Sequence, residues 1–299
     1  MRERVERAIQ VGPCRVVVPG GQAESALDAV VEARRRGLAE PLLLGDASAI
    51  RDGLVAAGED PAGWAIEDVP DPGRAARRAV ELVRAGEAEV VLKGALSTGE
   101  LMRAVLDRES GLRQGRLVSD VLVTEHGASK PRLLGVTDGG VNVAPTLAEK
   151  RAILENAVTV FHRLGVARPK VAALCALETV SPSMPHTAEA AALAGLSARG
   201  ELEGCEVFGP VALDGALSVQ AARQKGIGHP AAGEADILLV PAIEVGNALG
   251  KAFTWLAARP VAHVVWGARA PVLIPSRAEG AMDKLCSMAL GALVARGGP

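Results

Sequence analysis

Short apolar runs, each followed by a stretch with helical periodicity, constrain this chain more than any other feature. The run at 237–240 (ILLV) is apolar at every position, as expected for a strand buried on both faces. Similar runs predict strands at 15–19, 41–44, 89–92, 117–123, 132–136, 170–174, 206–208, 236–240, 262–265 and 271–274. Helices are expected at 23–36, 71–85, 146–164, 186–199, 215–225, 244–258 and 279–296. The alternation predicts an α/β fold with mostly parallel sheets between layers of helices.

Composition limits the class of protein. The 299 residues are 49% hydrophobic with no tyrosine, so a large core must be built from Ala, Val and Leu. The net charge of -2 makes nucleic acid an unexpected partner. The four cysteines are far apart, which disfavours a zinc cage or disulfide framework. With no apolar signal core and no run near the ~20 residues that span a bilayer, we expect a cytoplasmic protein with no membrane contact.

No repeat or loose linker divides the chain. The strands expected at 117–123 and 132–136 are close enough to form an antiparallel pair, and a Gly-rich turn follows at 137–140. We place the first domain boundary at that turn. The predicted domains are a discontinuous first one, residues 1–138 plus 270–299, and a second one, residues 139–269.

The most informative motif is Pro275-Ser276-Arg277, between an apolar strand and a helix. Arginine offers a planar fork that matches phosphate oxygens, and the serine hydroxyl adds a donor at a helix start. Asp283 follows Ser276 by seven residues, about two helical turns. The alternative reading is a Ser276 helix cap beside a solvated arginine and an exposed acid, and a cap does not exclude a site.

Polar residues also follow other predicted strands. Lys93 and Thr98 supply an ammonium and a hydroxyl around a flexible turn, which can cradle an anion, or else a helix cap with a surface lysine. Arg103 lies between apolar neighbours and is most simply a surface residue. Asp138 and Asn142 follow the strand at 132–136. Because ligands bind beyond the carboxyl ends of parallel strands, all five are candidate substrate-binding residues.

Other motifs give weaker signals. Residues 226–229 (GIGH) imitate a dinucleotide fingerprint but follow a helix and precede a strand. The five histidines show no metal-ligand spacing, so we expect no metal site. Cys286 lies one turn beyond Asp283 and is a candidate nucleophile only if it is not buried packing.

Several segments together resemble the phosphate acetyltransferase/phosphate butyryltransferase family, with a pattern closer to the butyryl branch. The resemblance runs from about residue 91 to the C-terminus. It is carried by VLKGALSTGELMRAVLDRESGLRQGRLVSD, LLGVTDGGVNVAPTLAEKRAILENAVTVFHRLG, KVAALCALETVSPSMPHTAEAAALA, GPVALDGALS, ADILLVPAIEVGNALGKAF and APVLIPSRAEGAMDKLCSMAL. His186 departs from it, since a small or apolar residue is expected there.

The resemblance implies a two-domain fold like that of isocitrate dehydrogenase, with the active site in the cleft between domains. It implies a homodimer or higher homo-oligomer. It also implies reversible transfer of a butyryl or acetyl group between coenzyme A, a substrate rather than a bound cofactor, and inorganic phosphate. Ser276 and Arg277 would contact the phosphate or the reacting carbonyl, and Asp283 would be the base for the coenzyme A thiol.

Three rival classes remain open at this point. A phosphate acyltransferase that uses acyl carrier protein would show a basic docking patch. A NAD(P)-dependent hydroxy-acid dehydrogenase of similar fold would need an aspartate metal cluster and a catalytic tyrosine, and tyrosine is absent. A two-lobed binding protein without enzymatic activity would be expected to carry an export signal. Chain-length preference and the residues that hold the coenzyme A phosphates do not follow from the sequence.

Overall fold

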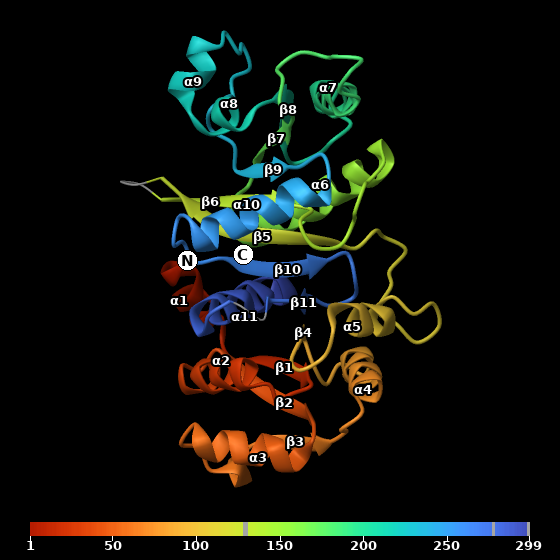
Figure 1. The fold of residues 1–299 in the computed structure, drawn as a ribbon, viewed down its shortest axis with the longest axis vertical. Coiled ribbons are helices and arrows are strands. Elements are labelled where there is room, and N and C mark those ends of the chain that lie inside the picture. The colour runs from red at the N-terminus through yellow and green to blue at the C-terminus, as the bar shows by residue number, and fades with distance from the viewer. Residues whose placement is uncertain (128–130, 277–278, 298–299) are drawn as a thin grey trace. The chain divides into compact units, whose positions relative to one another are not determined.

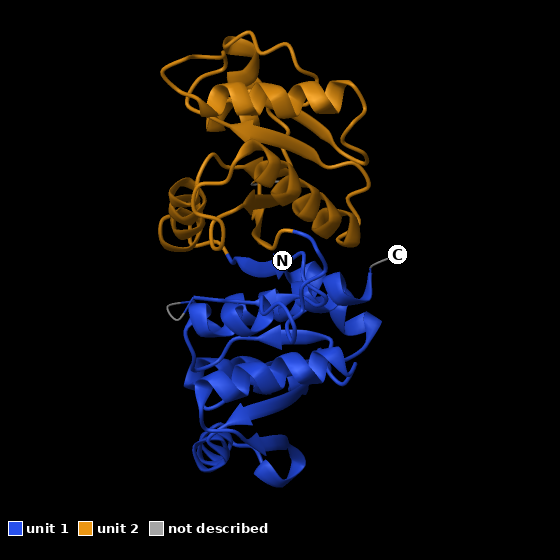
Figure 2. Cartoon of the chain, turned by 90° about the vertical axis from the view of Figure 1, so that its right-hand side faces the viewer, with its two compact units in different colours: residues 1–116, 260–297 blue, residues 117–259, 298–299 orange. Residues whose placement is uncertain are grey.

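The computed structural model describes residues 1–127, 131–276 and 279–297 (Figure 1). The chain forms two compact units, one of residues 1–116 with 260–297 and one of residues 117–259 (Figure 2). Each unit contains a mostly parallel sheet with helices packed against it, so the predicted α/β class is confirmed. Within the described ranges, no helix is both long and apolar enough to cross a membrane.

The first unit is built on six strands in the order β3-β2-β1-β4-β11-β10. Its strands are β1 (Cys14–Pro19), β2 (Ala39–Gly45), β3 (Ala65–Asp68), β4 (Val90–Leu92), β10 (Ala262–Trp266) and β11 (Val272–Leu273). Neighbours are parallel except β10, which is antiparallel to β11. The amino end of β10 therefore lies at the same edge as the carboxyl ends of β4 and β11.

The helices of this unit are α1 (Arg2–Val11), α2 (Glu24–Arg35), α3 (Ala47–Ala56), η1 (Pro61–Gly63), α4 (Pro72–Arg84), α5 (Thr98–Val105) and α11 (Ala281–Arg296). The last helix, α11, packs against α1, α2 and the strands β4, β10 and β11, whereas α4 packs against α5 and the strands β1, β2 and β4. From Lys284 to Val294 every residue of α11 is buried. A helix that is buried on all sides must be enclosed by other elements, so α11 is the central helix of the unit.

The second unit is built on five strands in the order β5-β6-β9-β7-β8. They are β5 (Ser119–His126), β6 (Arg132–Thr137), β7 (Lys170–Leu174), β8 (Glu206–Val211) and β9 (Ile237–Leu239). The pair β5–β6 is antiparallel, as predicted, and the other pairs are parallel. The helices are α6 (Leu147–Arg163), α7 (His186–Ala198), α8 (Leu213–Leu217), α9 (Val219–Gln224) and α10 (Ile243–Trp255).

The secondary structure differs from the sequence prediction in several places. The single helix expected at 215–225 is two helices, because Ser218 is extended (φ -126°, ψ 113°) and its side chain caps α9 through the Ala221 N–H. The elements α1, α3, η1 and β3 are absent from the sequence prediction. Strand β3 lies at the sheet edge, and its sequence AIED has charged residues where a buried strand would be apolar.

The compact units change at 116/117 and 259/260, whereas the sequence places domain boundaries at 138/139 and 269/270. The first difference has a physical reason: β5 pairs with β6 along its length, so both strands belong to the second unit. The predicted boundaries remain a proposal about domains that fold as units.

Candidate functional site

The loops after β1, β4 and β11 meet at one edge of the first unit's sheet. These strands are parallel neighbours, and Leu273 pairs with Leu92. Lys93 follows β4 directly, and its backbone N–H donates to the carbonyl of Leu273 across 3.0 Å. Ser276 is exposed and lies three residues beyond β11. Two predicted site residues thus share one carboxyl edge, while Arg277 lies outside the described residues.

Two glycines hold these loops together. Gly20 has a φ of +72°, and a Cβ there would lie 2.5 Å from the backbone nitrogen of Ala95. A Cβ at Gly94 would lie 2.1 Å from the carbonyl oxygen of Gly20. The chains also bond directly, because the N–H of Ala95 donates to Gly20 across 2.7 Å. The position of Lys93 is therefore fixed by a backbone approach that only glycine allows.

The loop after β4 leads into a well-capped helix. The hydroxyl of Ser97 accepts from the N–H of Glu100 (3.1 Å), and the Glu100 carboxylate accepts from the N–H of Ser97 (2.9 Å). This capping box satisfies the start of α5. Thr98 is half-exposed at the first helical position, and Arg103 is exposed in the last turn. Lys93 itself is 8% exposed, with Nζ 3.5 Å from the carbonyl of Leu96.

Asp283 belongs to the start of α11. One carboxylate oxygen accepts from the N–H of Gly280 across 3.2 Å, and the other accepts from the N–H of Val261 across 3.0 Å. The first contact caps the helix, and the second ties the helix to the segment that enters β10. Both oxygens are therefore used by backbone donors.

In the second unit, Asp138 organises the loop after β6. It is 2% exposed. Its Oδ1 accepts from the N–H groups of Gly140 (2.8 Å) and Val141 (2.9 Å), and its Oδ2 accepts from the N–H of Asn142 (3.1 Å). The Asn142 amide donates to Oδ2 at 2.6 Å and to the carbonyl of Val118 at 2.9 Å. The structure thus joins Asp138 to Asn142, as two residues of one rigid loop.

A second buried carboxylate, Asp120, lies against this loop and was missed in the sequence. A Cβ at Gly140 would lie 2.9 Å from its Oδ2. Burial and the charge of Asp120 raise the pKa of Asp138, and the loop N–H groups oppose that rise. Asp120 precedes Asp138 by 18 positions on an antiparallel neighbour, so only the β5–β6 pairing could have revealed the approach.

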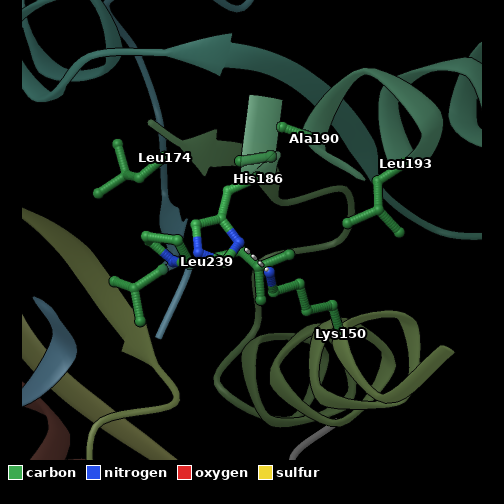
Figure 3. A pocket seen from close by; sticks show the side chains of 9 residues that line it. Lys150, Leu174, His186, Ala190, Leu193 and Leu239 are labelled. Carbon is green, nitrogen blue, oxygen red and sulfur yellow. Dashed lines mark hydrogen bonds between the residues drawn. The ribbon is translucent and has the colours of Figure 1, made fainter. Parts of the chain in front are cut away.

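A third polar cluster also escaped sequence reasoning. Lys150 on α6 is 3% exposed, forms an ion pair with Glu189, and has Nζ 3.2 Å from Nδ1 of His186. Burial disfavours the charge of Glu189, but its hydrogen bonds from Lys150 and His186 outweigh that effect and lower its pKa. Lys150 and His186 line a cavity of about 10 Å³ together with Leu174 and Leu239 (Figure 3), roughly the space of one water molecule.

Both sheets carry polar side chains where parallel strands end, which is the arrangement of an α/β enzyme that binds small molecules beyond its strands. Residues 73–292 match the family model described as phosphate acetyl/butaryl transferase. The chain is 42% identical to a phosphate butyryltransferase of Clostridium acetobutylicum over 94% of this chain and 93% of that one. It is 39% identical to a phosphate acetyltransferase of Rhizobium meliloti over 95% and 89%. The chain belongs to the phosphate acetyl/butyryl transferase family, and it is an enzyme of that phosphate acyltransferase type.

Solved structures agree on the fold. A branched-chain phosphotransacylase from Enterococcus faecalis V583 superposes with a TM-score of 0.83 at 29% identity, over 95% of this chain and 99% of that one. A 4-hydroxythreonine-4-phosphate dehydrogenase from Burkholderia phymatum gives a TM-score of 0.55 at 16% identity, over 94% and 98%. The second likeness concerns the fold alone.

Proposed function

We propose that this enzyme transfers a short acyl group reversibly between coenzyme A and inorganic phosphate, by direct transfer in a ternary complex. The observation that carries the proposal is the meeting of Ser276 and Lys93 at one carboxyl edge, in a chain of this family. Acyl-CoA and phosphate would give acyl phosphate and free coenzyme A. Butyryl and acetyl are the acyl groups that the names of the relatives suggest.

Each proposed residue has a task in that reaction. A phosphate oxygen attacks the thioester carbonyl, an oxyanion develops, and the C–S bond breaks to release a thiolate. Ser276 would donate to the oxyanion, and Arg277, whose role rests on the motif, would hold the phosphate through its planar fork. Lys93 would offset negative charge at the same edge. Bringing two anionic substrates together makes orientation a large part of catalysis.

The other predicted residues have different proposed roles in this reaction. Thr98 and Arg103, at the start and in the last turn of α5, remain proposed substrate contacts. Asp138 and Asn142 are proposed to position the loop after β6, since their polar groups are engaged with each other and with the backbone. Asp283 is the base that the family resemblance implies, and each of its carboxylate oxygens accepts one backbone N–H group.

The cysteines support direct transfer over a covalent acyl-enzyme. Burial raises the pKa of Cys286 to about 11 and that of Cys14 to about 12. Burial also raises the pKa values of Cys175 and Cys205. Because the thiolate is the nucleophile, none of the four is poised to accept an acyl group. Four free thiols also suit the cytoplasm, where we propose that the enzyme works.

The decisive assay measures thiol release from butyryl-CoA in the presence and absence of phosphate. Phosphate-dependent release of one thiol per acyl phosphate formed is the expected result. Activity only with acyl carrier protein thioesters would favour the rival phosphate acyltransferase. An acyl-CoA panel at fixed phosphate then gives the chain-length preference, for which we expect butyryl-CoA and acetyl-CoA both to react.

Replacing Ser276 tests the oxyanion role. Ser276→Ala should lower kcat roughly 10²–10³-fold, because losing one oxyanion donor costs roughly 2.7–4 kcal/mol in the barrier. Steady-state kinetics with butyryl-CoA and phosphate measures it. The control is Ser48→Ala, since Ser48 is exposed on α3. A Ser276→Ala enzyme with kcat within a few-fold of the parent would remove this serine from the proposed mechanism.

We further propose a homodimer formed through α10. This helix buries only Gly246 and Gly250, while Val245 on it and Leu256 just beyond it are 37% and 86% exposed. Glu244 and Lys251 are exposed seven residues apart, so they lie on one face. Antiparallel pairing of two copies would set Glu244 of one against Lys251 of the other. A self-complementary patch of this kind suits a two-fold interface.

A further inference from the structure

Glu279 carries an acceptor without a donor, one turn beyond Ser276. Its backbone N–H donates to the carbonyl of Ser276 across 3.2 Å. The Glu279 side chain is only 10% exposed, and its Oε2 atom is buried with no hydrogen-bond partner among the described residues. A buried acceptor without a hydrogen-bond donor destabilises the folded state. The fold tolerates this penalty directly beside a predicted site residue.

The groups around Glu279 account for its other oxygen. On β10, His263 places Nε2 3.5 Å from Oε1 of Glu279. On α11, the Lys284 ammonium donates to the backbone carbonyl of Glu279 across 2.5 Å. Burial lowers the pKa of Lys284, and the charges of Glu279, Asp283 and Asp28 oppose that shift. Oε1 of Glu279 thus faces the imidazole of His263, and the Lys284 ammonium lies nearby. Oε2 of Glu279 accepts no hydrogen bond among the described residues.

The contrast with Asp283 is direct. Both oxygens of Asp283 accept backbone N–H groups at the start of α11. Each oxygen of Asp283 therefore has one lone pair already engaged, whereas Oε2 of Glu279 accepts no hydrogen bond among the described residues and keeps both lone pairs for a proton. The amino end of β10 is anchored to α11 as well, because the N–H of His263 donates to the Ser287 hydroxyl across 3.0 Å. His263 and Glu279 are therefore held on connected elements.

We propose that Glu279, rather than Asp283, accepts the coenzyme A thiol proton, and that His263 is a positioning residue for it. This inference rests on the proposed function. In the direction that acylates coenzyme A, the S–H proton passes to Oε2 of Glu279. The thiolate then adds to the carbonyl carbon of the acyl phosphate, and the C–O bond to phosphate breaks. The departing phosphate takes the proton from Glu279, so the carboxylate is restored.

The test follows the rate of acyl-CoA formation from butyryl phosphate across pH 6.5 to 9 with Glu279→Gln. A thiol with an ordinary pKa near ~8.5 is about 3% ionised at pH 7. Without its proton acceptor, the variant must use that fraction. We expect kcat to fall about 30-fold at pH 7 and about 4-fold at pH 8, and to approach the parent rate near pH 9.

Three further measurements sharpen the result. Asp283→Asn should lose stability in urea unfolding with a rate deficit that does not shrink as pH rises. The exposed control Glu203→Gln should match the parent enzyme at every pH. His263→Asn should lower kcat at pH 7, and this loss should vanish in the Glu279→Gln background, because a positioning residue acts through its partner.

Each of these measurements can overturn the proposed role of Glu279. A Glu279→Gln deficit that is constant across pH would make the residue structural and overturn the inference, as would a pH-compensated deficit in Asp283→Asn. Parent-like rates of a folded Glu279→Gln enzyme at pH 7 would overturn it too. If the parent enzyme shows no phosphate-dependent transfer with any acyl-CoA, the proposed function itself fails, and the two failures are thereby distinguished.

Discussion

Gly94 shows how a single residue positions the loops of the candidate site. A Cβ at Gly94 would meet backbone rather than a flexible side chain, at 2.1 Å from the Gly20 carbonyl oxygen. Gly94→Ala should therefore destabilise the fold by about 1–3 kcal/mol and lower kcat by displacing Lys93. Urea unfolding and steady-state kinetics measure both effects. Gly99→Ala is the matched control, because its Cβ would meet nothing closer than 4.0 Å; a parent-like Gly94→Ala would show that the loops can separate freely.

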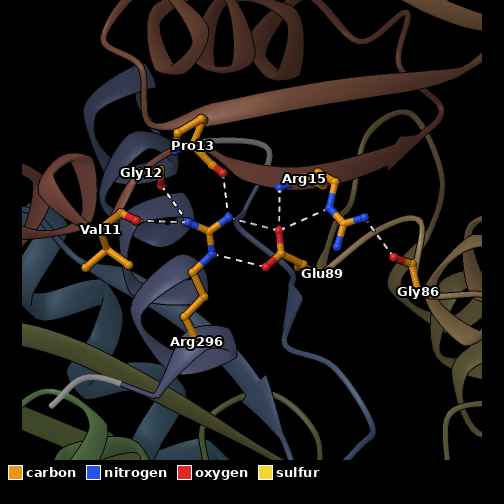
Figure 4. A network of polar contacts seen from close by, with 7 residues as sticks. All are labelled: Val11, Gly12, Pro13, Arg15, Gly86, Glu89 and Arg296. Atoms are coloured by element: carbon orange, nitrogen blue, oxygen red, sulfur yellow. Dashed lines mark hydrogen bonds and ion pairs between the residues drawn. The ribbon is translucent and has the colours of Figure 1, made fainter.

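Glu89 binds two arginines at the opposite end of β1 and β4 (Figure 4). Arg296 donates through Nε at 3.0 Å and Nη2 at 3.1 Å, and the backbone N–H of Arg15 donates at 3.0 Å. Arg296 also donates to the carbonyls of Gly12 and Pro13. These contacts tie the end of α11 to the start of β1. The network lies away from the carboxyl edge, so its role is stability.

The pKa of Glu89 predicts a pH dependence of unfolding. The Arg296 hydrogen bonds lower it from 4.5 to about 2. Because the folded state holds the carboxylate ionised, the stabilisation is complete above about pH 4.5 and disappears as pH falls toward 2. Glu89→Gln should cost about 1–2 kcal/mol at pH 7, allowing for partial solvent screening. Urea unfolding at pH 7 and pH 3 checks it: a gap between parent and variant that stays constant would contradict the prediction.

At the residue scale, the sequence indicated which polar residues follow the strands, but it did not indicate which groups they contact. Ser276 and Lys93 are local signals, because Lys93 directly follows β4 and Ser276 lies three residues beyond β11. The engagement of Asp283 is not local: one of its donors is Val261, 22 residues earlier on the segment entering β10. Likewise, nothing in the spacing of His263 and Glu279 suggests their contact. Hydrogen bonds between elements decide which carboxylate keeps an oxygen without a donor. Sequence spacing does not predict these hydrogen bonds.

At the scale of elements, one ion pair links α6 to α7. Lys150 is 3% exposed and pairs with Glu189. Glu189→Gln would leave the lysine charge buried without its counter-ion, so we expect a loss of about 3–5 kcal/mol. Lys150→Met removes the buried charge itself and should cost clearly less. Urea unfolding of both variants measures the two losses in the free energy of unfolding. Equal losses would show that the pair contributes through packing rather than through charge.

Strong periodicity made most elements predictable, and the exceptions have causes. The strand β7 has the predicted bounds, because its neighbours β8 and β9 bury an apolar run. The break between α8 and α9 depends on Ser218 choosing a cap over helix continuation, which propensity alone does not decide. The edge strand β3 pairs on one side with β2, so it needs no apolar pattern of its own.

At the scale of the whole chain, the α/β class followed from the alternation of strands and helices, whereas unit boundaries depend on strand pairing. The α10 surface poses the remaining question at this scale. If two copies pair through it, Leu256→Asp should convert the dimer to a monomer, since the charge is harmless on a residue that is 86% exposed. Val55→Asp is the control, because Val55 is 62% exposed on α3.

Sedimentation equilibrium of the parent and both variants measures the assembly. The parent and Val55→Asp should have twice the mass of one chain, and Leu256→Asp should have the mass of one chain. Charge reversal refines the geometry: Glu244→Lys should weaken the dimer, and Glu244→Lys with Lys251→Glu should restore it, because a two-fold axis applies each change to both copies. A parent that sediments as a monomer, or a Leu256→Asp variant that stays dimeric, would place the interface elsewhere or remove it.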